Sequence, residues 1–174
     1  MLFYGSLDRE TNIEALKFIK YELIPSLKIK EIMKKIRLNI FGSGQSPSYL
    51  CLDNDRDINF IGQVEDTGKY IRGADVIIVP VKNPSGVKLR ILESLACGKS
   101  IIASPEAVTG LDDELKGNIF VRRTAEEFVE VIRWMVEGKV VNNTDMHIIS
   151  KNKNMDDLIC YLKKEVDRKS RRKK

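Results

Sequence analysis

One helix of this sequence should be apolar, yet it begins with an unusual set of small and charged residues. Gly86 opens it, the cations Lys88 and Arg90 follow, and the carboxylate of Glu93 comes next. The first N–H groups of a helix have no partner within the helix and carry the positive end of its dipole. Cations are therefore unfavourable there unless an anion neutralises them. A phosphate or diphosphate is the natural candidate. The alternative is that both cations are solvated surface side chains.

Glu93 lies at the border of the apolar face of the same helix. A helical wheel places six residues on one broad arc directed at a core: Val87, Leu89, Ile91, Leu92, Leu95 and Ala96. A carboxylate beside that arc can accept hydrogen bonds from neutral hydroxyls, and ribose hydroxyls are the usual partner of an acidic residue in a nucleotide site. The alternative is a pair with Arg90, three residues earlier, at the edge of the buried face.

The composition disfavours several other kinds of chemistry. The chain has one histidine, His147, and three widely spaced cysteines, Cys51, Cys97 and Cys160. No cluster of His and Cys has the spacing of a zinc site, and an odd number of scattered thiols is typical of a reducing compartment. We therefore expect no metal, no cofactor and no histidine base. The sequence assigns no catalytic residue, and the cysteines indicate a cytoplasmic protein.

The net charge of +5 is concentrated at one end of the chain. The last twelve residues, KKEVDRKSRRKK, hold eight basic and two acidic side chains, so the rest is close to neutral. A body without net positive charge argues against a nucleic-acid groove. The tail is either a solvated helix end or an electrostatic contact with the inner membrane face, to which each Lys or Arg adds about 1 kcal/mol. No apolar run approaches the ~20 residues of a membrane span, and MLFYGSL does not resemble a signal peptide.

Short apolar runs alternate along the chain with segments of helical period. The predicted strands are 1–5, 36–42, 58–62, 75–81, 100–104 and 118–122. The predicted helices are 12–27, with Thr11 or Asn12 as its cap, then about 47–52, 66–72, 86–97, 124–137 and 155–168. This alternation predicts an α/β fold with a Rossmann-like, doubly wound, six-stranded parallel sheet in the order 3-2-1-4-5-6.

That strand order predicts where a ligand binds. Ligands of such sheets lie outside the carboxyl ends of the strands, where the order reverses between the first and fourth strands. The loops at that point are 5–11, which begins with Gly5 and Ser6, and 82–85, directly before Gly86. Gln63 and Val64 leave the third strand at the rim of the same crevice, where a nucleobase can lie against the backbone. The turn FGSGQSP is a weaker signal, because a proline stands where a third phosphate-binding glycine would be.

Four segments in order carry a resemblance to a known family. They are FYGSLDRETNIEAL…IPSL at 3–27, LNIFGSGQSPSYL at 38–50, INFIGQVED at 58–66 and ADVIIVPVKNPSGVKLRILESLACGKSIIASPEAVTGL at 74–111. Together they resemble nucleotide-sugar glycosyltransferases of the family 4 type. The resemblance is to the C-terminal, donor-binding half of the GT-B fold. It covers residues 1–138 and leaves 139–165 as a helical extension and 166–174 as a basic tail.

The resemblance implies roles for individual residues. In the family a pair of Glu residues spaced E-x7-E brackets this helix start. Glu93 matches the second Glu, which binds the ribose, whereas Ser85 stands at the first position, which usually touches the donor sugar. A subgroup with the pattern GsGvklKilE, here Gly86, Val87, Lys88 and onward, also lacks the first Glu. In that subgroup the cation at the position of Arg90 is a partner of the diphosphate.

The resemblance also implies a function. It is transfer of a hexosyl group from a UDP-, GDP- or ADP-linked sugar to an unknown acceptor, usually with retention and without a tightly bound metal. An N-terminal acceptor domain, in cis or in trans, would complete the enzyme. Ser6 and Thr11 stand where many members carry Arg and Lys, so the alternative is a degenerate, non-catalytic module that binds a nucleotide or a partner. A nucleotide-sugar epimerase would need more acidic and histidine residues. A redox Rossmann protein is disfavoured because YGSLDRE contains no GxGxxG.

Overall fold

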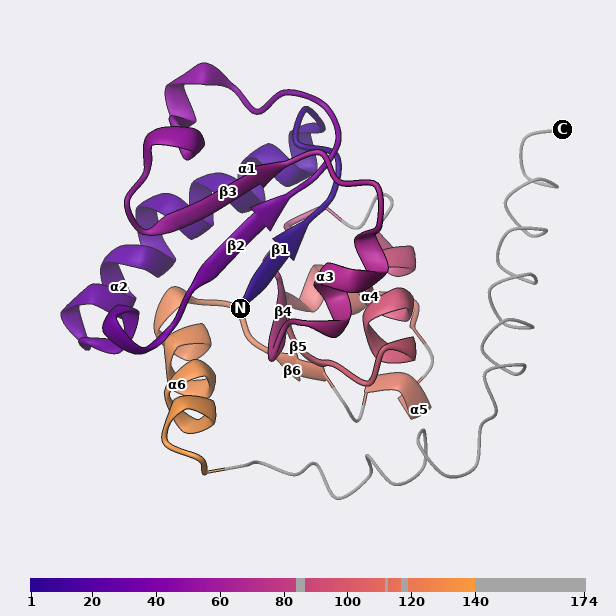
Figure 1. Ribbon diagram of the computed structural model, residues 1–174. Helices are drawn as coiled ribbons and strands as arrows, with labels where there is room; N and C mark the ends of the chain where they lie inside the picture. Colours follow the sequence, from indigo (N-terminus) through magenta and orange to yellow (C-terminus); the bar gives the residue numbers. More distant parts are fainter. Residues whose placement is uncertain (84–86, 112, 117–118, 140–174) are drawn as a thin grey trace, which may run out of the picture.

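The fold is built on one six-stranded sheet whose strands are all parallel (Figure 1). The computed structural model describes residues 1–83, 87–111, 113–116 and 119–139. The strand order β3-β2-β1-β4-β5-β6 confirms the predicted order. The strands are β1 Leu2–Tyr4, β2 Leu38–Phe41, β3 Ile58–Gly62, β4 Val76–Val79, β5 Ser100–Ala103 and β6 Ile119–Val121.

Helices cover both faces of this sheet, which explains why its central strands are apolar throughout. The α-helices are α1 Glu10–Phe18, α2 Ile24–Ile29, α3 Thr67–Arg72, α4 Val87–Ala96, α5 Asp113–Lys116 and α6 Ala125–Val136. Helices α1, α2 and α6 pack together on one face, where the rings of Phe18 and Phe128 meet edge to face at 5.5 Å. Helices α3, α4 and α5 lie on the other face (Figure 1).

The first helical segment differs from its prediction at both ends. It begins at Glu10 rather than at residue 12, after Arg9, whose side chain makes no capping hydrogen bond. It then passes through a π-helical turn, Ile19–Leu23, into α2, so the segment ends at Ile29. Pro25 follows the π-helical turn directly and lies inside this continuous helical segment. The prediction that Thr11 or Asn12 caps the helix was therefore wrong.

The other predicted elements among the described residues agree with their positions to within a few residues, whereas α5 and the 3₁₀ turns Ile32–Lys35 and Pro105–Val108 were not predicted. The segment around 47–52 consists of two 3₁₀ turns, Ser48–Leu50 and Leu52–Asn54. Helix α6 begins with a reciprocal cap, in which Thr124 accepts from the Glu127 N–H and Glu127 accepts from the Thr124 N–H. The predicted helix 155–168, together with His147 and Cys160, lies outside the described residues.

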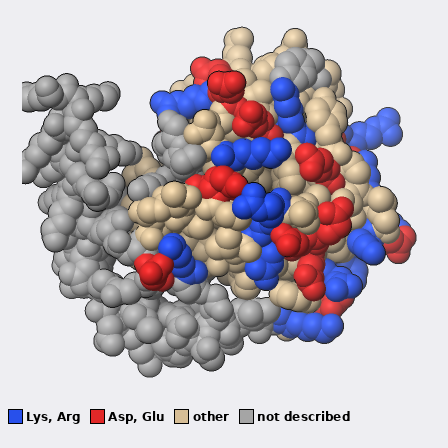
Figure 2. Space-filling model, turned by 180° about the vertical axis from the view of Figure 1, so that it is seen from behind, with Lys and Arg blue, Asp and Glu red and all other residues tan. Residues whose placement is uncertain are grey.

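One side of the described chain is mixed in charge. On the side that Figure 2 presents, basic and acidic side chains are interspersed rather than gathered by sign. Within the described ranges, no helix is long and apolar enough to cross a bilayer. The same ranges contain no group of three His, Cys, Asp or Glu residues arranged to hold a metal ion.

Candidate functional site

The candidate site lies where the strands β1, β2 and β3 end and the helix α4 begins. Two adjoining pockets open there, of about 160 Å³ and about 240 Å³. Tyr4, Gly5 and Ser6, which follow one another at the end of β1, line both pockets and form their common wall. The first pocket is completed by Arg9, Thr11, Asn12, Leu89, Arg90 and Glu93. The second is completed by Phe41, Gly42, Ser43, Gln63, Val64 and Thr67.

Glycine is required where the backbones of this wall approach each other. A Cβ atom on Gly42 would lie 1.7 Å from the carbonyl oxygen of Gly5. The Gly5 N–H donates to the Phe41 carbonyl at 3.3 Å, and the Gly42 N–H donates to the Gly62 carbonyl at 3.0 Å. The ends of β1, β2 and β3 are thus drawn together by backbone hydrogen bonds.

Arg90 crosses this end of the sheet from one layer of helices to the other. Its Nη2 donates to Asn12 Oδ1, in α1, at 2.8 Å. Its guanidinium carbon lies 5.1 Å from the ring centroid of Phe3 and 5.5 Å from that of Tyr4, within the range of cation–π attraction. A Cβ on Gly5 would lie 2.1 Å from Nη2, so only glycine leaves room for the guanidinium group at that point.

The burial of Arg90 corrects the helical wheel drawn from the sequence. Arg90 is only 8% exposed, whereas Leu89, which the wheel placed on the buried arc, is 50% exposed at the rim of the first pocket. The interpretation of Arg90 as a solvated surface cation was therefore wrong. The wheel failed because it treats every charge as solvated, while the aromatic rings of Phe3 and Tyr4 and the amide of Asn12 here hold the guanidinium group inside.

One nitrogen of this guanidinium group has no hydrogen-bond partner among the described residues. Nη1 of Arg90 is buried and makes no hydrogen bond to any residue that the structure describes. Burial lowers the pKa of Arg90 to about 10, which leaves the group protonated at neutral pH. An unpaired buried N–H is costly, and a charged one more so, unless a ligand supplies an acceptor. Because Arg90 lines the first pocket, an anion bound there can provide that acceptor.

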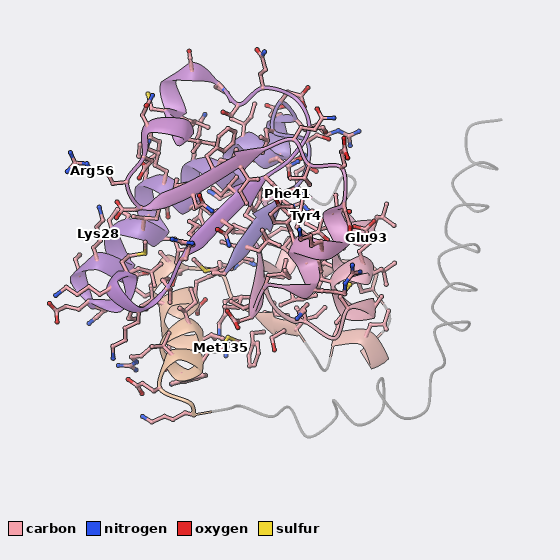
Figure 3. The ribbon with its side chains drawn as sticks, in the orientation of Figure 1. Tyr4, Lys28, Phe41, Arg56, Glu93 and Met135 are labelled. Atoms are coloured by element: carbon pink, nitrogen blue, oxygen red, sulfur yellow. The ribbon has the colours of Figure 1, made fainter. Side chains whose placement is uncertain are left out.

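Glu93 and Tyr4 lie close together and both line the first pocket (Figure 3). The Tyr4 hydroxyl is 3.3 Å from Glu93 Oε2, and the carboxylate is partly exposed. Tyr4 itself is buried and its ring stacks on that of Phe41, with centroids 5.2 Å apart. Burial raises the pKa of Tyr4 above its ordinary value, so the hydroxyl stays protonated and can donate.

The structure brings together six of the ten residues predicted for the site. Arg90 and Glu93 line the first pocket, Gln63 and Val64 the second, and Gly5 and Ser6 both. Ser85 and Gly86 lie outside the described residues. Val87 and Lys88 form the first turn of α4, as the backbone shows.

Sequence reasoning missed two polar residues that organise the site, Tyr4 and Asn12. A signal for Asn12 was present, because it falls on the buried stripe of α1 with Ala15 and Leu16, where a polar residue needs a partner. It has two, since Nδ2 also donates to the Ser6 carbonyl at 2.7 Å. Tyr4 carried a weaker signal, as the one hydroxyl in the apolar run MLFYG. Arg9 also lines the first pocket, where it adds an exposed cation that the prediction did not include.

A family model described as "Glycosyl transferases group 1" matches residues 1–138 of this chain. Comparison with the sequences of curated proteins found no match.

Several solved structures share the fold at low sequence identity. The Anabaena protein Alr3699/HepE, in complex with UDP and glucose, is 13% identical at a TM-score of 0.63, with 95% of this chain and 48% of that chain covered. The catalytic domain of the cholesterol-α-glucosyltransferase from Helicobacter pylori is 18% identical at a TM-score of 0.57, with 86% and 94% covered. The C-terminal domain of LpcC, a group 1 glycosyl transferase from Francisella tularensis, is 17% identical at a TM-score of 0.53, with 92% and 84% covered.

The chain spans 34% to 48% of the length of several other chains with this fold, TarM and HepE among them.

Proposed function

Since the chain belongs to the glycosyl transferases group 1 family, we propose that it is the donor-binding half of a glycosyltransferase of the family 4 type. Its ligand is a nucleoside-diphosphate sugar, from which a hexosyl group passes to an acceptor with retention of configuration. The observation that carries the proposal is the buried guanidinium group of Arg90, whose Nη1 has no hydrogen-bond partner among the described residues. UDP in the HepE complexes and UDP-2-fluoro glucose in an Escherichia coli structure are ligands of proteins with the same fold, which supports this ligand class.

The proposed ligand fits the two pockets in one orientation. The diphosphate lies in the first pocket against Arg90 and near the first turn of α4. The ribose hydroxyls donate to Glu93, and the base lies in the second pocket against Gln63 and Val64. Charge that develops on the departing nucleoside diphosphate is stabilised by the guanidinium group and the helix N-terminus.

The acceptor side belongs to a second domain, in cis or in trans. This is supported by the coverage of TarM and HepE, of which the chain spans less than half. Co-expression with an N-terminal acceptor domain should give sugar transfer, and the anomeric configuration of the product, measured by NMR, tests retention.

We place the protein in the cytoplasm, with the basic tail 166–174 against the inner membrane face. Binding of the full chain, but not of a chain ending at 165, to anionic rather than neutral vesicles tests that contact.

Titration of the chain with UDP, GDP and ADP by calorimetry tests donor binding directly. We expect one of them to bind, and Glu93→Ala to weaken that binding about tenfold or more through the lost hydroxyl contacts. Glu130→Ala, an exposed carboxylate on α6, is the matched control and should bind as the wild type does. Absence of binding up to millimolar nucleotide, with Glu93→Ala indistinguishable from wild type, would reject the proposal.

A second candidate is a degenerate module that binds a nucleotide or a partner without catalysis. It is favoured by the uncharged residues Ser6 and Thr11 in the first pocket, where many members of the family 4 type have cations. The two candidates separate in the co-expression experiment. Nucleotide binding without any transfer in the presence of an acceptor domain favours the module.

A further inference from the structure

We propose that the hydroxyl group of Tyr4 positions Glu93 towards a ribose diol, so that this site selects ribonucleotides over nucleotides that lack the sugar hydroxyls. The inference rests on the proposed function, since it names the part of the nucleotide that Glu93 recognises. It assigns Tyr4 as a positioning residue that acts through the carboxylate.

The Tyr4 hydroxyl has more acceptors within reach than protons to give. It lies 3.1 Å from the Arg90 carbonyl oxygen, 3.2 Å from Ser94 Oγ and 3.3 Å from Glu93 Oε2. A phenolic hydroxyl donates one proton, so the three acceptors compete for it. Burial raises the pKa of Tyr4, which keeps that proton in place over the physiological range.

The competition favours Glu93. The Arg90 carbonyl already accepts from Ser94 Oγ at 2.8 Å, in addition to its place in the hydrogen-bond ladder of α4. Ser94 Oγ donates its own proton in that bond and remains a neutral acceptor. An ionised carboxylate forms shorter and stronger hydrogen bonds than a neutral oxygen. The Tyr4 proton therefore goes to Glu93 Oε2.

Tyr4 can direct Glu93 because its own ring is fixed. Tyr4 is 5% exposed, and its ring stacks on that of Phe41 with an interplanar angle of 18°. The guanidinium carbon of Arg90 lies 5.5 Å from the same ring. Glu93, by contrast, is partly exposed and would be free to rotate towards solvent. With Oε2 held by Tyr4, the other oxygen, Oε1, makes no hydrogen bond or ion pair with the part of the chain that the structure describes. It is thus available to hydroxyl donors in the first pocket, which both residues line.

The test compares two forms of one nucleotide on a set of variants. The diphosphate that binds best among UDP, GDP and ADP is titrated by calorimetry beside its 2′,3′-dideoxy form. We expect Tyr4→Phe to weaken the ribonucleotide about tenfold, the usual effect of losing a hydrogen bond to a charged group, and to leave the dideoxy form unchanged. Glu93→Gln should show the same selectivity, and the double variant Tyr4→Phe/Glu93→Gln should lose no more than Glu93→Gln alone.

Tyr70→Phe is the matched control, because Tyr70 packs on Phe41 in the same group of rings but lies outside both pockets. It should bind both forms as the wild type does. Equal weakening of both forms by Tyr4→Phe means a structural role for the hydroxyl and overturns the inference. Glu93-dependent binding that Tyr4→Phe leaves intact overturns the inference and spares the proposed function. A wild-type chain that binds no nucleotide overturns both.

Discussion

Arg90 and Asn12 join the two layers of helices across the end of the sheet, through a hydrogen bond of 2.8 Å from Nη2 to Oδ1. The two residues are 78 positions apart in the chain and come from helices on opposite faces. Their contact passes over the backbone of Gly5, at the point where the strand order reverses. The cation that lines the first pocket is therefore also part of the packing that holds α4 against α1.

Replacing Arg90 by Met should separate binding from stability. Met fills a similar volume and removes a buried charge whose Nη1 has no hydrogen-bond partner among the described residues. That gain offsets the loss of the hydrogen bond to Asn12 Oδ1, so the unfolding temperature of the free protein should change little. Affinity for a nucleoside diphosphate should fall about tenfold to a hundredfold, because a charge-assisted contact is lost. Calorimetry and thermal unfolding measure the two effects, with Arg133→Met on the exposed side of α6 as control. A large fall in unfolding temperature with unchanged affinity would contradict this role.

Gly5→Ala should lower the free energy of unfolding by more than backbone strain alone would, because the added Cβ also meets Arg90. Gly5 has a φ of 148°, and its added Cβ would lie 2.1 Å from Arg90 Nη2. Gly98 also has a positive φ, of 66°, but its Cβ would meet nothing within 4 Å. We expect Gly98→Ala to destabilise by about 1–2 kcal/mol through backbone strain, and Gly5→Ala by about 1–3 kcal/mol more. Urea unfolding compares them, and equal losses would mean that Arg90 moves aside at little cost.

The orientation of α4 can be checked with two leucines three residues apart. Leu92 is 2% exposed, whereas Leu89 is 50% exposed at the rim of the first pocket. Leu92→Ala should lower the free energy of unfolding by about 2–5 kcal/mol through the cavity that it leaves. Leu89→Ala should change it by about 0.5 kcal/mol or less, as is usual at a surface position. If both variants lose a similar free energy of unfolding in urea, then Leu89 is buried as the helical wheel predicted, and the orientation described here is wrong.

The cap of α6 predicts part of the acid sensitivity of the fold. Glu127 Oε2 accepts from the Arg123 N–H at 2.6 Å and the Thr124 N–H at 3.1 Å, and these bonds lower the pKa of Glu127 below its ordinary 4.5. A lowered native pKa means stabilisation that is complete above about pH 4.5 and is lost as the pH falls through the native value.

Glu127→Gln should accordingly reduce stability at pH 7 and make less difference at pH 3. Urea unfolding at pH 7, 4.5 and 3 measures this. The neighbouring Glu126→Gln serves as control, because those two N–H groups bond to Glu127. A loss for Glu127→Gln that is the same at all three pH values would show that its charge does not matter.

The sheet and most of its helices could be predicted because their signals are local. Runs such as DVIIVPV and the Thr124 cap are read from a few neighbouring residues, and the alternation of strands and helices then limits the strand order. That order was enough to bring Gly5, Ser6 and Glu93 to one crevice. The π-helical turn at Ile19–Leu23 carried no comparable signal. The first helical segment also extends two residues beyond its prediction at each end.

The details of the site depend on contacts that sequence periodicity does not reveal. Arg90 is buried because Asn12, Phe3 and Tyr4 meet it from two other elements, and Gly5 leaves the space. The Tyr4 hydroxyl reaches Glu93 across 89 positions of sequence. A charge on an apolar helix can be recognised locally, but whether it faces water or a prepared cavity is decided by these distant partners.

The wall formed by Tyr4, Gly5 and Ser6 makes the two pockets neighbours with a shared boundary. A molecule that occupies both pockets loses its translational and rotational entropy once on binding, whereas two separate fragments would each lose their own. A nucleoside and a pyrophosphate offered separately should therefore bind far more weakly than the nucleoside diphosphate that joins them. For the proposed ligand, the wall of Tyr4, Gly5 and Ser6 would thus join two shallow hollows into a single site.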